Sequence, residues 1–332
     1  MTNCGERCII GNGRKERRAR KSAKNNMDKT ILTIGNATMD VLLNVPFAPG
    51  GGRTAFSKDK YEFTSGGSGA YTAVAAKRAG TDAVLCARIG EDEMGKRLLD
   101  EYRENGVNIN YMARDAIDQT GLNLYIVEEF GPASKICYPG ANKNLNSGNI
   151  EFAFNSYPNL VTASLEIEEE LVRYVSNMAR AKEIPFVLDA SGAYESLRLD
   201  RIGTVDVFIA DEKDVEIITG IRPGSPEDCL RASISLFNRM DVKYAVLKLS
   251  GRRAAHMYDG KYCHLLESAR LQSIDRRAQQ QSFVGAFCSQ LLSTGDPYRS
   301  TEYALAASTI AASKAGGISS IPNDGEIRSL LN

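Results

Sequence analysis

The chain has 332 residues, 43% of them apolar, with 41 basic and 41 acidic side chains and no tryptophan. This length suffices for one large domain or two of medium size, each with a substantial core. The balanced charge gives no overall attraction to nucleic acid or anionic lipid, and no run of about 18–20 apolar residues could cross a membrane. The seven cysteines are scattered and form no C-x-x-C pair. We therefore expect a cytoplasmic protein with reduced thiols and with neither nucleic acid nor a membrane as partner.

Residues 1–26 differ in composition from the rest of the chain. They hold eight basic and two acidic side chains, which leaves the remainder with a net charge of −6. They lack the apolar stretch of a secretory signal. A basic arm for nucleic acid is one interpretation, and a disordered basic leader is the one that we favour. We expect the folded part to begin near Met27.

The first half of the chain mixes short apolar runs with helical patterns. The expected elements are a strand at 31–34, a helix that follows Gly66-Gly67-Ser68-Gly69 and ends near Gly80, a strand at 83–87, a helix at 94–105, and strand-like runs at 122–127 and 134–138. The last two runs flank Gly131-Pro132 and predict a hairpin. A glycine-rich turn before a helix allows a ligand to approach the backbone, although this signal is weak on its own.

After residue 160, strands and helices alternate regularly. Strands are expected at 160–165, 186–189, 207–210 and 245–249, and helices at 168–181, 212–219 and 226–238. Such alternation predicts an α/β fold with a mostly parallel sheet and helices on both of its faces. Ligands of such sheets bind at the carboxyl ends of the strands.

Six short motifs occur in order along the chain: I-G-N-A-T-M-D at 34–40, G-G-S-G-A at 66–70, R-I-G-E-D-E-M-G at 88–95, G-A-N at 140–142, E-K-D-V-E-I-I-T-G at 212–220 and S-F-V-G-A-F at 282–287. Together they resemble the PfkB/ribokinase family of carbohydrate kinases over about residues 31–325. The resemblance implies a ribokinase-like three-layer sandwich with a small β lid. The core would comprise residues 27–41, 65–107 and 140–332, and the lid residues 42–64 and 108–139.

The resemblance also implies ATP-dependent phosphoryl transfer, with magnesium, to a hydroxyl of a sugar or nucleoside. Asp40 would bind two substrate hydroxyls through charge-assisted hydrogen bonds. The other expected substrate-side positions are Gly66, Gly67, Ser68, Tyr71, Asn142 and Glu166, although Glu166 could instead cap its strand. The expected nucleotide and magnesium positions are Asp211, Asp214, Lys248, Ser250 and Gly251. The family's D-T-T-G-A-G-D loop supplies backbone N–H groups for the phosphoryl charge and ends in the Asp that accepts the hydroxyl proton.

That catalytic loop departs from the family pattern in this chain. The position of the proton-accepting Asp is Gln281, whose amide has no useful basicity near neutral pH. Ala278, Gln279 and Gln280 stand in the anion-binding loop, where glycines are lost. The loop is then either strained or of another shape. We expect Gln279–Gln281 to form a solvated loop.

Further departures lie outside the loop. Tyr71 and Ser68 stand where the family has Asn and Lys, Asp211 and Asp214 replace its N-x-x-E pair, and Ser250 and Arg253 replace glycines. In the family, the positions of Asp275 and Arg277 help to hold a monovalent cation. We expect the Arg277 guanidinium to pair with Asp275, and hence no bound monovalent cation.

These departures favour a pseudokinase that still binds a small sugar, polyol or nucleoside. One alternative is an active sugar or nucleoside kinase with an atypical site. Another is a structural or regulatory subunit of an active paralogue. The resemblance is compatible with a homodimer formed through the lid or with a heteromer that includes a paralogue.

Overall fold

The central sheet has eight strands in the order β14-β13-β12-β11-β10-β9-β1-β4, in a computed structural model that describes residues 29–129 and 133–332. Strands β12 to β4 pair in parallel, and β13 and β14 add an antiparallel edge. The bounds are Thr30–Ile34 (β1), Asp82–Cys86 (β4), Leu160–Ser164 (β9), Phe186–Asp189 (β10), Thr204–Asp211 (β11), Asp241–Leu249 (β12), Ala254–Tyr258 (β13) and Cys263–Glu267 (β14). The sheet confirms the expected α/β fold. The expected leader, residues 1–26, lies outside the described residues.

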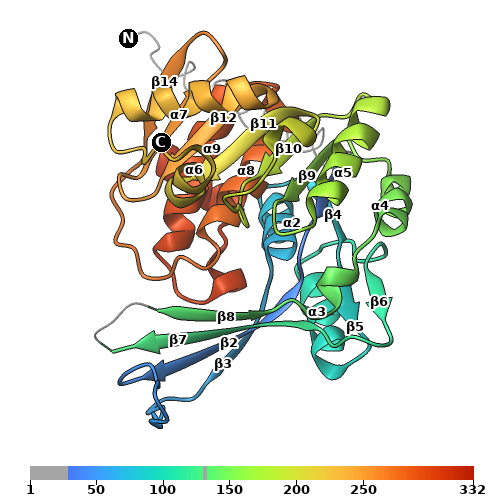
Figure 1. Ribbon diagram of the computed structural model, residues 1–332, viewed down its shortest axis with the longest axis vertical. Helices are drawn as coiled ribbons and strands as arrows, with labels where there is room; N and C mark the ends of the chain where they lie inside the picture. The colour runs from blue at the N-terminus through green and yellow to red at the C-terminus, as the bar shows by residue number, and fades with distance from the viewer. Residues whose placement is uncertain (1–28, 130–132) are drawn as a thin grey trace, which may run out of the picture.

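Helices cover both faces of this sheet (Figure 1). One face packs against α2 (Ser68–Arg78), α3 (Glu93–Glu104), α8 (Gln279–Thr294), α9 (Pro297–Ala312) and α10 (Asp324–Leu331). The other packs against α4 (Ser147–Ala153), α5 (Glu169–Ala181), α6 (Glu212–Thr219) and α7 (Pro226–Arg239). Because strand side chains alternate, Ile31 enters the first core and Leu32 the second. The three-layer sandwich expected from the sequence is therefore confirmed.

A second sheet of four strands projects from the core at the lower edge of Figure 1. Its order is β3-β2-β7-β8, with bounds Thr38–Val45 (β2), Glu62–Gly66 (β3), Gly121–Glu128 (β7) and Ser134–Tyr138 (β8). Strands β7 and β8 pair antiparallel, as the hairpin pattern predicts. A two-stranded sheet joins β5 (Arg88–Gly90) to β6 (Ala113–Asp115). We call the four-stranded sheet the lid; the chain boundaries proposed for it, 42–64 and 108–139, stay a prediction.

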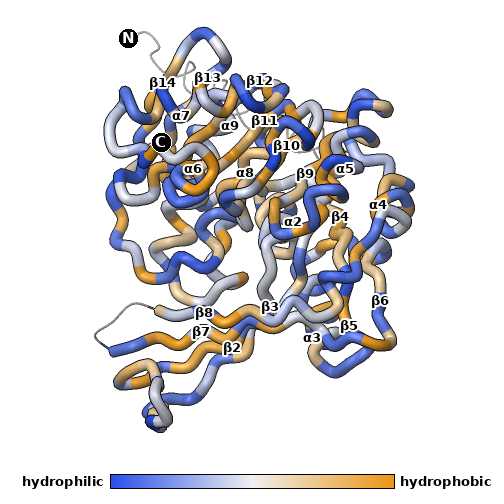
Figure 2. Tube along the Cα trace, in the orientation of Figure 1, coloured by the Kyte–Doolittle hydropathy of each residue, from blue (hydrophilic) through white to orange (hydrophobic). Residues whose placement is uncertain are grey.

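Apolar side chains also occur on the lid, and Met39 of β2 and Phe63 of β3 join it to the first core. Figure 2 shows hydrophobic residues along β2 and β7 as well as in the central sheet. Ile136 and Tyr138 on β8 are exposed. Within the described ranges, none of the helices has the length and apolar character needed to cross a bilayer.

Helices α2 and α8 approach each other unusually closely. An ideal Cβ built on Gly285 would lie 2.5 Å from the Cβ of Ala75 and 2.5 Å from the carbonyl oxygen of Thr72. Real Cβ atoms do not come so near, so a glycine is needed in α8 at this crossing. The contact fixes the start of α8 relative to α2, and both helices contribute side chains to the site described next.

Candidate functional site

A cavity of about 370 Å³ lies between the lid and the carboxyl ends of the central strands. Its size falls within the range of about 300–1,000 Å³ that is common for small-molecule pockets. The predicted residues that line it are Asp40, Gly67, Ser68, Tyr71, Glu166, Arg277 and Gln281. Lid residues, among them Asn123, Tyr125 and Lys135, complete the wall. The fold thus brings seven sequence-predicted positions from distant parts of the chain into one polar cavity.

The Asp40 carboxylate is held by three donors. Its Oδ1 accepts from Thr38 Oγ1 at 3.0 Å and Asn123 Nδ2 at 2.8 Å, and its Oδ2 accepts from the Tyr71 hydroxyl at 3.3 Å. Burial raises the pKa of Asp40, and the hydrogen bonds from Asn123 and Thr38 oppose that rise. Asn123 was not predicted from the sequence. It faces Asp40 because the parallel register of β2 and β7 sets these two residues side by side.

Gly66 and Asn142 do not line the cavity but position residues that do. A Cβ on Gly66 would lie 2.2 Å from Asp40 Oδ1, so a side chain there would displace the carboxylate. The Asn142 amide donates to the carbonyl oxygens of Ala37 and Pro139 and accepts from the N–H of Ala37. It therefore ties the segment after β8 to the start of β2.

Glu166 faces the cavity rather than only ending its strand. Its Oε2 accepts from Ser68 Oγ at 2.6 Å and from Asn36 Nδ2 at 3.1 Å. Ser68 Oγ also lies 3.1 Å from Ser164 Oγ. The cavity therefore contains a second carboxylate beside Asp40, held by donors from the glycine-rich turn and from the end of β1.

The expectation that Gln279–Gln281 form a solvated loop is wrong. These residues are the first turn of α8, and Gln280 and Gln281 are buried. Gln280 Nε2 donates to Asp189 Oδ1 at 2.9 Å, and Gln281 Nε2 lies 3.3 Å from Ser191 Oγ. The amides are buried because the packing of α8 on α2 carries its first turn into the interior.

The backbone of this segment is not strained. Ala278 has φ of −100°, and among the non-glycine residues that the structure describes, positive φ occurs only at Tyr157, Glu183 and Arg253. Ala278 and the residues after it therefore adopt ordinary backbone conformations, and the helix begins at Gln279.

Arg277 pairs with Asp275 as expected. Its Nη2 lies 2.7 Å and its Nε 3.0 Å from Asp275 Oδ2, and the N–H of Gly316 donates to the same oxygen. Burial opposes ionisation of Asp275, but the hydrogen bonds from Arg277 outweigh it and the pKa of Asp275 is lowered. Nη1 of Arg277 is buried without a partner among the described residues. The absence of a bound monovalent cation stays a prediction.

The predicted nucleotide-side residues lie away from the lid cavity. Asp211 caps α6 by accepting from the N–H groups of Lys213 and Asp214. Burial, reinforced by the charge of Asp211, raises the pKa of Asp214 to about 8. The described residues contain no group of three or more His, Cys, Asp or Glu side chains that could hold a metal ion.

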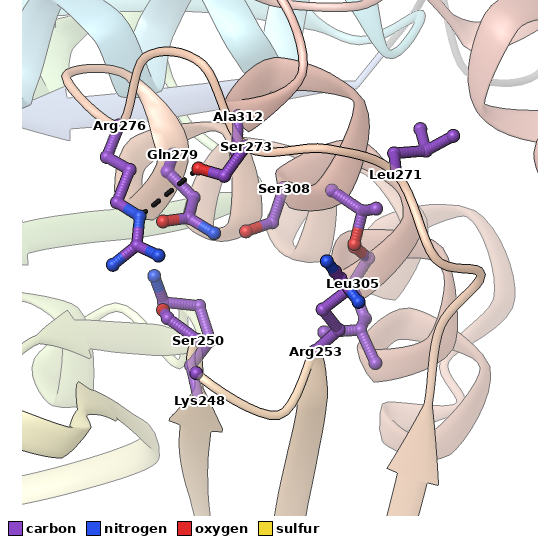
Figure 3. A pocket seen from close by; sticks show the side chains of 12 residues that line it. Lys248, Ser250, Arg253, Leu271, Ser273, Arg276, Gln279, Leu305, Ser308 and Ala312 are labelled. Carbon is purple, nitrogen blue, oxygen red and sulfur yellow. Dashed lines mark hydrogen bonds between the residues drawn. The ribbon is translucent and has the colours of Figure 1, made fainter.

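Lys248, Ser250 and Gly251 line a second cavity of about 70 Å³, which Figure 3 shows. Arg253, Arg276 and Gln279 also form its wall. Arg253 has φ of +53°, in the left-handed region that favours the glycine it replaces. This cavity is far below the volume that common small-molecule sites occupy.

Comparison with known proteins gives one consistent result. Residues 28–324 match the family described as pfkB family carbohydrate kinase. A ribokinase of Schizosaccharomyces pombe is 27% identical over 91% of this chain and 98% of its own length, and one of Haemophilus influenzae is 24% identical over 92% and 99%. The structure of Arabidopsis thaliana ribokinase complexed with ribose and ATP superimposes with a TM-score of 0.82 at 21% identity, covering 92% of this chain and 98% of that one.

We predict that Arg277→Met lowers the free energy of unfolding by about 1.5–3 kcal/mol at pH 6, because Asp275 loses its charge-assisted hydrogen bonds. The pKa of Asp275 is lower in the folded state than the ordinary value of about 3.9. The ionised carboxylate therefore stabilises the fold at pH values above about 3.9. That contribution is lost as the pH falls through the folded-state pKa. Urea unfolding should therefore show the difference between wild type and variant shrinking below pH 4.

Arg276→Met is the matched control for that comparison. Arg276 is exposed and makes one side-chain hydrogen bond, to Ser273. The Arg276→Met substitution should change the free energy of unfolding by less than about 0.5 kcal/mol both at pH 6 and at pH 3. An Arg277→Met loss of equal size at pH 6 and pH 3 would show that packing, rather than the ion pair, is responsible.

Arg253→Gly should stabilise the protein by about 0.5–1 kcal/mol, because glycine adopts positive φ without the steric cost that arginine pays there. Denaturant unfolding at 25 °C measures the change. The neighbouring Arg252, whose φ is not positive, provides the control, and Arg252→Gly should destabilise. A loss of stability in both variants would contradict the prediction.

Proposed function

The chain belongs to the pfkB family of carbohydrate kinases, and from this membership we propose that it binds a small sugar, polyol or nucleoside under its lid without transferring phosphate to it. The proposal rests on the contrast between two groups in the same cavity, the side chains of Asp40 and Gln281. The Asp40 carboxylate is present and is held by three donors, whereas the position of the proton acceptor is a buried amide, Gln281. Ligand binding needs the Asp40 carboxylate, whereas phosphoryl transfer needs a proton acceptor at the position of Gln281.

The arrangement around Asp40 suits a ligand with adjacent hydroxyl groups. A carboxylate has about four lone-pair sites, and three protein donors leave one or more of them for the ligand. Tyr125, Ser191 and Lys135 add further polar groups around the cavity wall. The cavity wall therefore offers both hydrogen-bond donors and hydrogen-bond acceptors, which hydroxyl-rich compounds require.

The residues at the predicted nucleotide-binding positions do not fit a magnesium–nucleotide complex. The cavity beside Lys248 measures about 70 Å³, and Arg253 and Arg276 extend into its wall. Burial, reinforced by the charge of Asp211, raises the pKa of Asp214 to about 8. We therefore assign no step of phosphoryl transfer to these residues.

The alternative is an active kinase with an atypical site. Glu166 favours it, because this carboxylate faces the same cavity and could accept a hydroxyl proton in place of Gln281. A role as a structural or regulatory subunit is a further alternative. The exposed Ile136 and Tyr138 of the lid support association there, as a homodimer or with a paralogue.

Asp40→Asn should weaken binding of the best ligand from a panel of sugars, polyols and nucleosides about 10–100-fold, because a charge-assisted hydrogen bond contributes about 1.5–3 kcal/mol. Isothermal titration calorimetry measures the affinity. Glu128→Gln, at the far end of β7, removes one carboxylate from the lid outside the cavity and should leave the affinity unchanged. If no panel member binds the wild type, ligand recognition under the lid is refuted.

Gln281→Asp alone should not restore ADP release, because the developing phosphoryl charge also needs aimed backbone N–H groups. Rebuilding 276–281 as T-T-G-A-G-D together with Arg253→Gly is the smallest change that we expect to give turnover. ADP release is followed with the same ligand panel. Turnover by the unmodified protein that Glu166→Gln abolishes and Glu128→Gln preserves would establish the active-kinase alternative instead.

A further inference from the structure

The two outer edges of the central sheet differ in how their backbone groups are used. At the β4 edge, the N–H of Leu85 donates to the carbonyl oxygen of Asn108 at 3.0 Å, and the N–H of Asn108 donates to the carbonyl oxygen of Ala83 at 2.9 Å. The segment after α3 therefore covers that edge. At the other edge, β14 pairs with β13 and with no further strand of the described ranges. Figure 1 shows β14 at the end of the core that is remote from the lid.

The register of β14 with β13 shows which of its backbone groups point outward. The N–H of Ser268, just after β14, donates to the carbonyl oxygen of Arg253 at 2.9 Å. Because hydrogen-bonded pairs alternate in an antiparallel ladder, every second residue of β14 directs its N–H and C=O groups away from β13. These outward residues are Cys263, Leu265 and Glu267. Their backbone groups have no hydrogen-bond partner among the residues that the structure describes.

Strand β14 lacks the features with which proteins usually protect an open edge. Its sequence C-H-L-L-E contains no proline and no lysine, and its register with β13 runs without a bulge. Leu265 is 47% exposed, and Tyr262, just before the strand, is 56% exposed. An edge that combines outward backbone groups with exposed apolar side chains is a template for a further strand.

The outward residues of β14 match a second copy of the same strand. An antiparallel pair with its twofold axis at Leu265 sets this residue opposite its own copy, and sets Cys263 opposite Glu267 of the second copy. Both pairs join outward residues, so each pair can exchange two backbone hydrogen bonds. The exposed leucine side chains meet on the axis, where they bury each other from water.

The charges near the two ends of β14 are complementary in this arrangement. Lys261, two residues before the strand, lies over the Tyr262 ring and forms no ion pair with a described residue. Glu267 is exposed and forms none either in the described ranges. Glu267 of one copy lies diagonally across from Lys261 of the other, and long side chains can span the roughly 7–8 Å between diagonal neighbours. Twofold symmetry repeats the contact, so opposite charges favour this direction and register.

We propose that β14 pairs antiparallel with β14 of a second copy of this chain, about a twofold axis at Leu265, so that two central sheets become continuous. The proposal goes beyond ligand binding under the lid, because β14 contributes no residue to the lid cavity. It also differs from association through the exposed Ile136 and Tyr138 of the lid. One pair of five-residue strands forms a modest interface, so monomer and dimer are in reversible equilibrium.

Sedimentation equilibrium of the full chain over a wide range of concentrations tests the proposal. The wild type should dimerise. Leu265→Lys sets two like charges opposite each other on the axis and should weaken the dimer about 30-fold or more. The matched control is Ile136→Lys, which introduces the same charge at an exposed apolar residue of the lid. This control should change the dimer dissociation constant less than about twofold.

A charge exchange tests the register. Glu267→Lys should weaken the dimer about tenfold, because repulsion between lysines replaces the diagonal attraction. Adding Lys261→Glu to Glu267→Lys should restore the dimer. Thermal melting checks that each variant is folded. The assignment is overturned by a wild type that stays monomeric, by a loss of the dimer in Ile136→Lys as large as that in Leu265→Lys, or by a double variant as weak as Glu267→Lys alone.

Discussion

The burial of one carboxylate, Asp40, constrains much of the structure around it. A charged group at 1% exposure must be given donors, and these come from three separate elements: β2 itself, the lid strand β7 and helix α2. Gly66 must lack a side chain to leave it room. The lid register, the place of α2 and the glycine-rich turn are therefore coupled through the requirements of a single side chain.

The two sides of the site differ in how well they suit a small ligand. Around Asp40 three protein donors hold the carboxylate, and the lid cavity has a volume suited to a small molecule. Around Lys248 the cavity is small, and Arg253 occupies a backbone conformation that suits glycine. A fold that binds two substrates can lose the use of one without losing the other, because each is held by different loops on a rigid sheet.

The architecture was largely predictable from sequence, because strand and helix periodicity is a local property and the motifs fall in a fixed order. The hairpin at 122–138 was predicted from its local pattern, and the pairing of Arg277 with Asp275 from the resemblance of this loop to the family's cation-binding loop. Asn123 was missed, since only the pairing of β2 with β7 reveals that it faces Asp40. The error at Gln279–Gln281 has a similar origin. Three glutamines look solvated in isolation, and their burial depends on how α8 packs against α2.

The near contact of α8 and α2 at Gly285 has a consequence for how this protein could change over evolutionary time. With 2.5 Å between the Thr72 carbonyl oxygen and the place of a Cβ on Gly285, any larger residue at this position would force the two helices apart. Mutations can therefore alter the loops at the helix starts while the scaffold that spaces them stays unchanged. A loop at the helix starts of such a scaffold can change its sequence and shape without any rebuilding of the core.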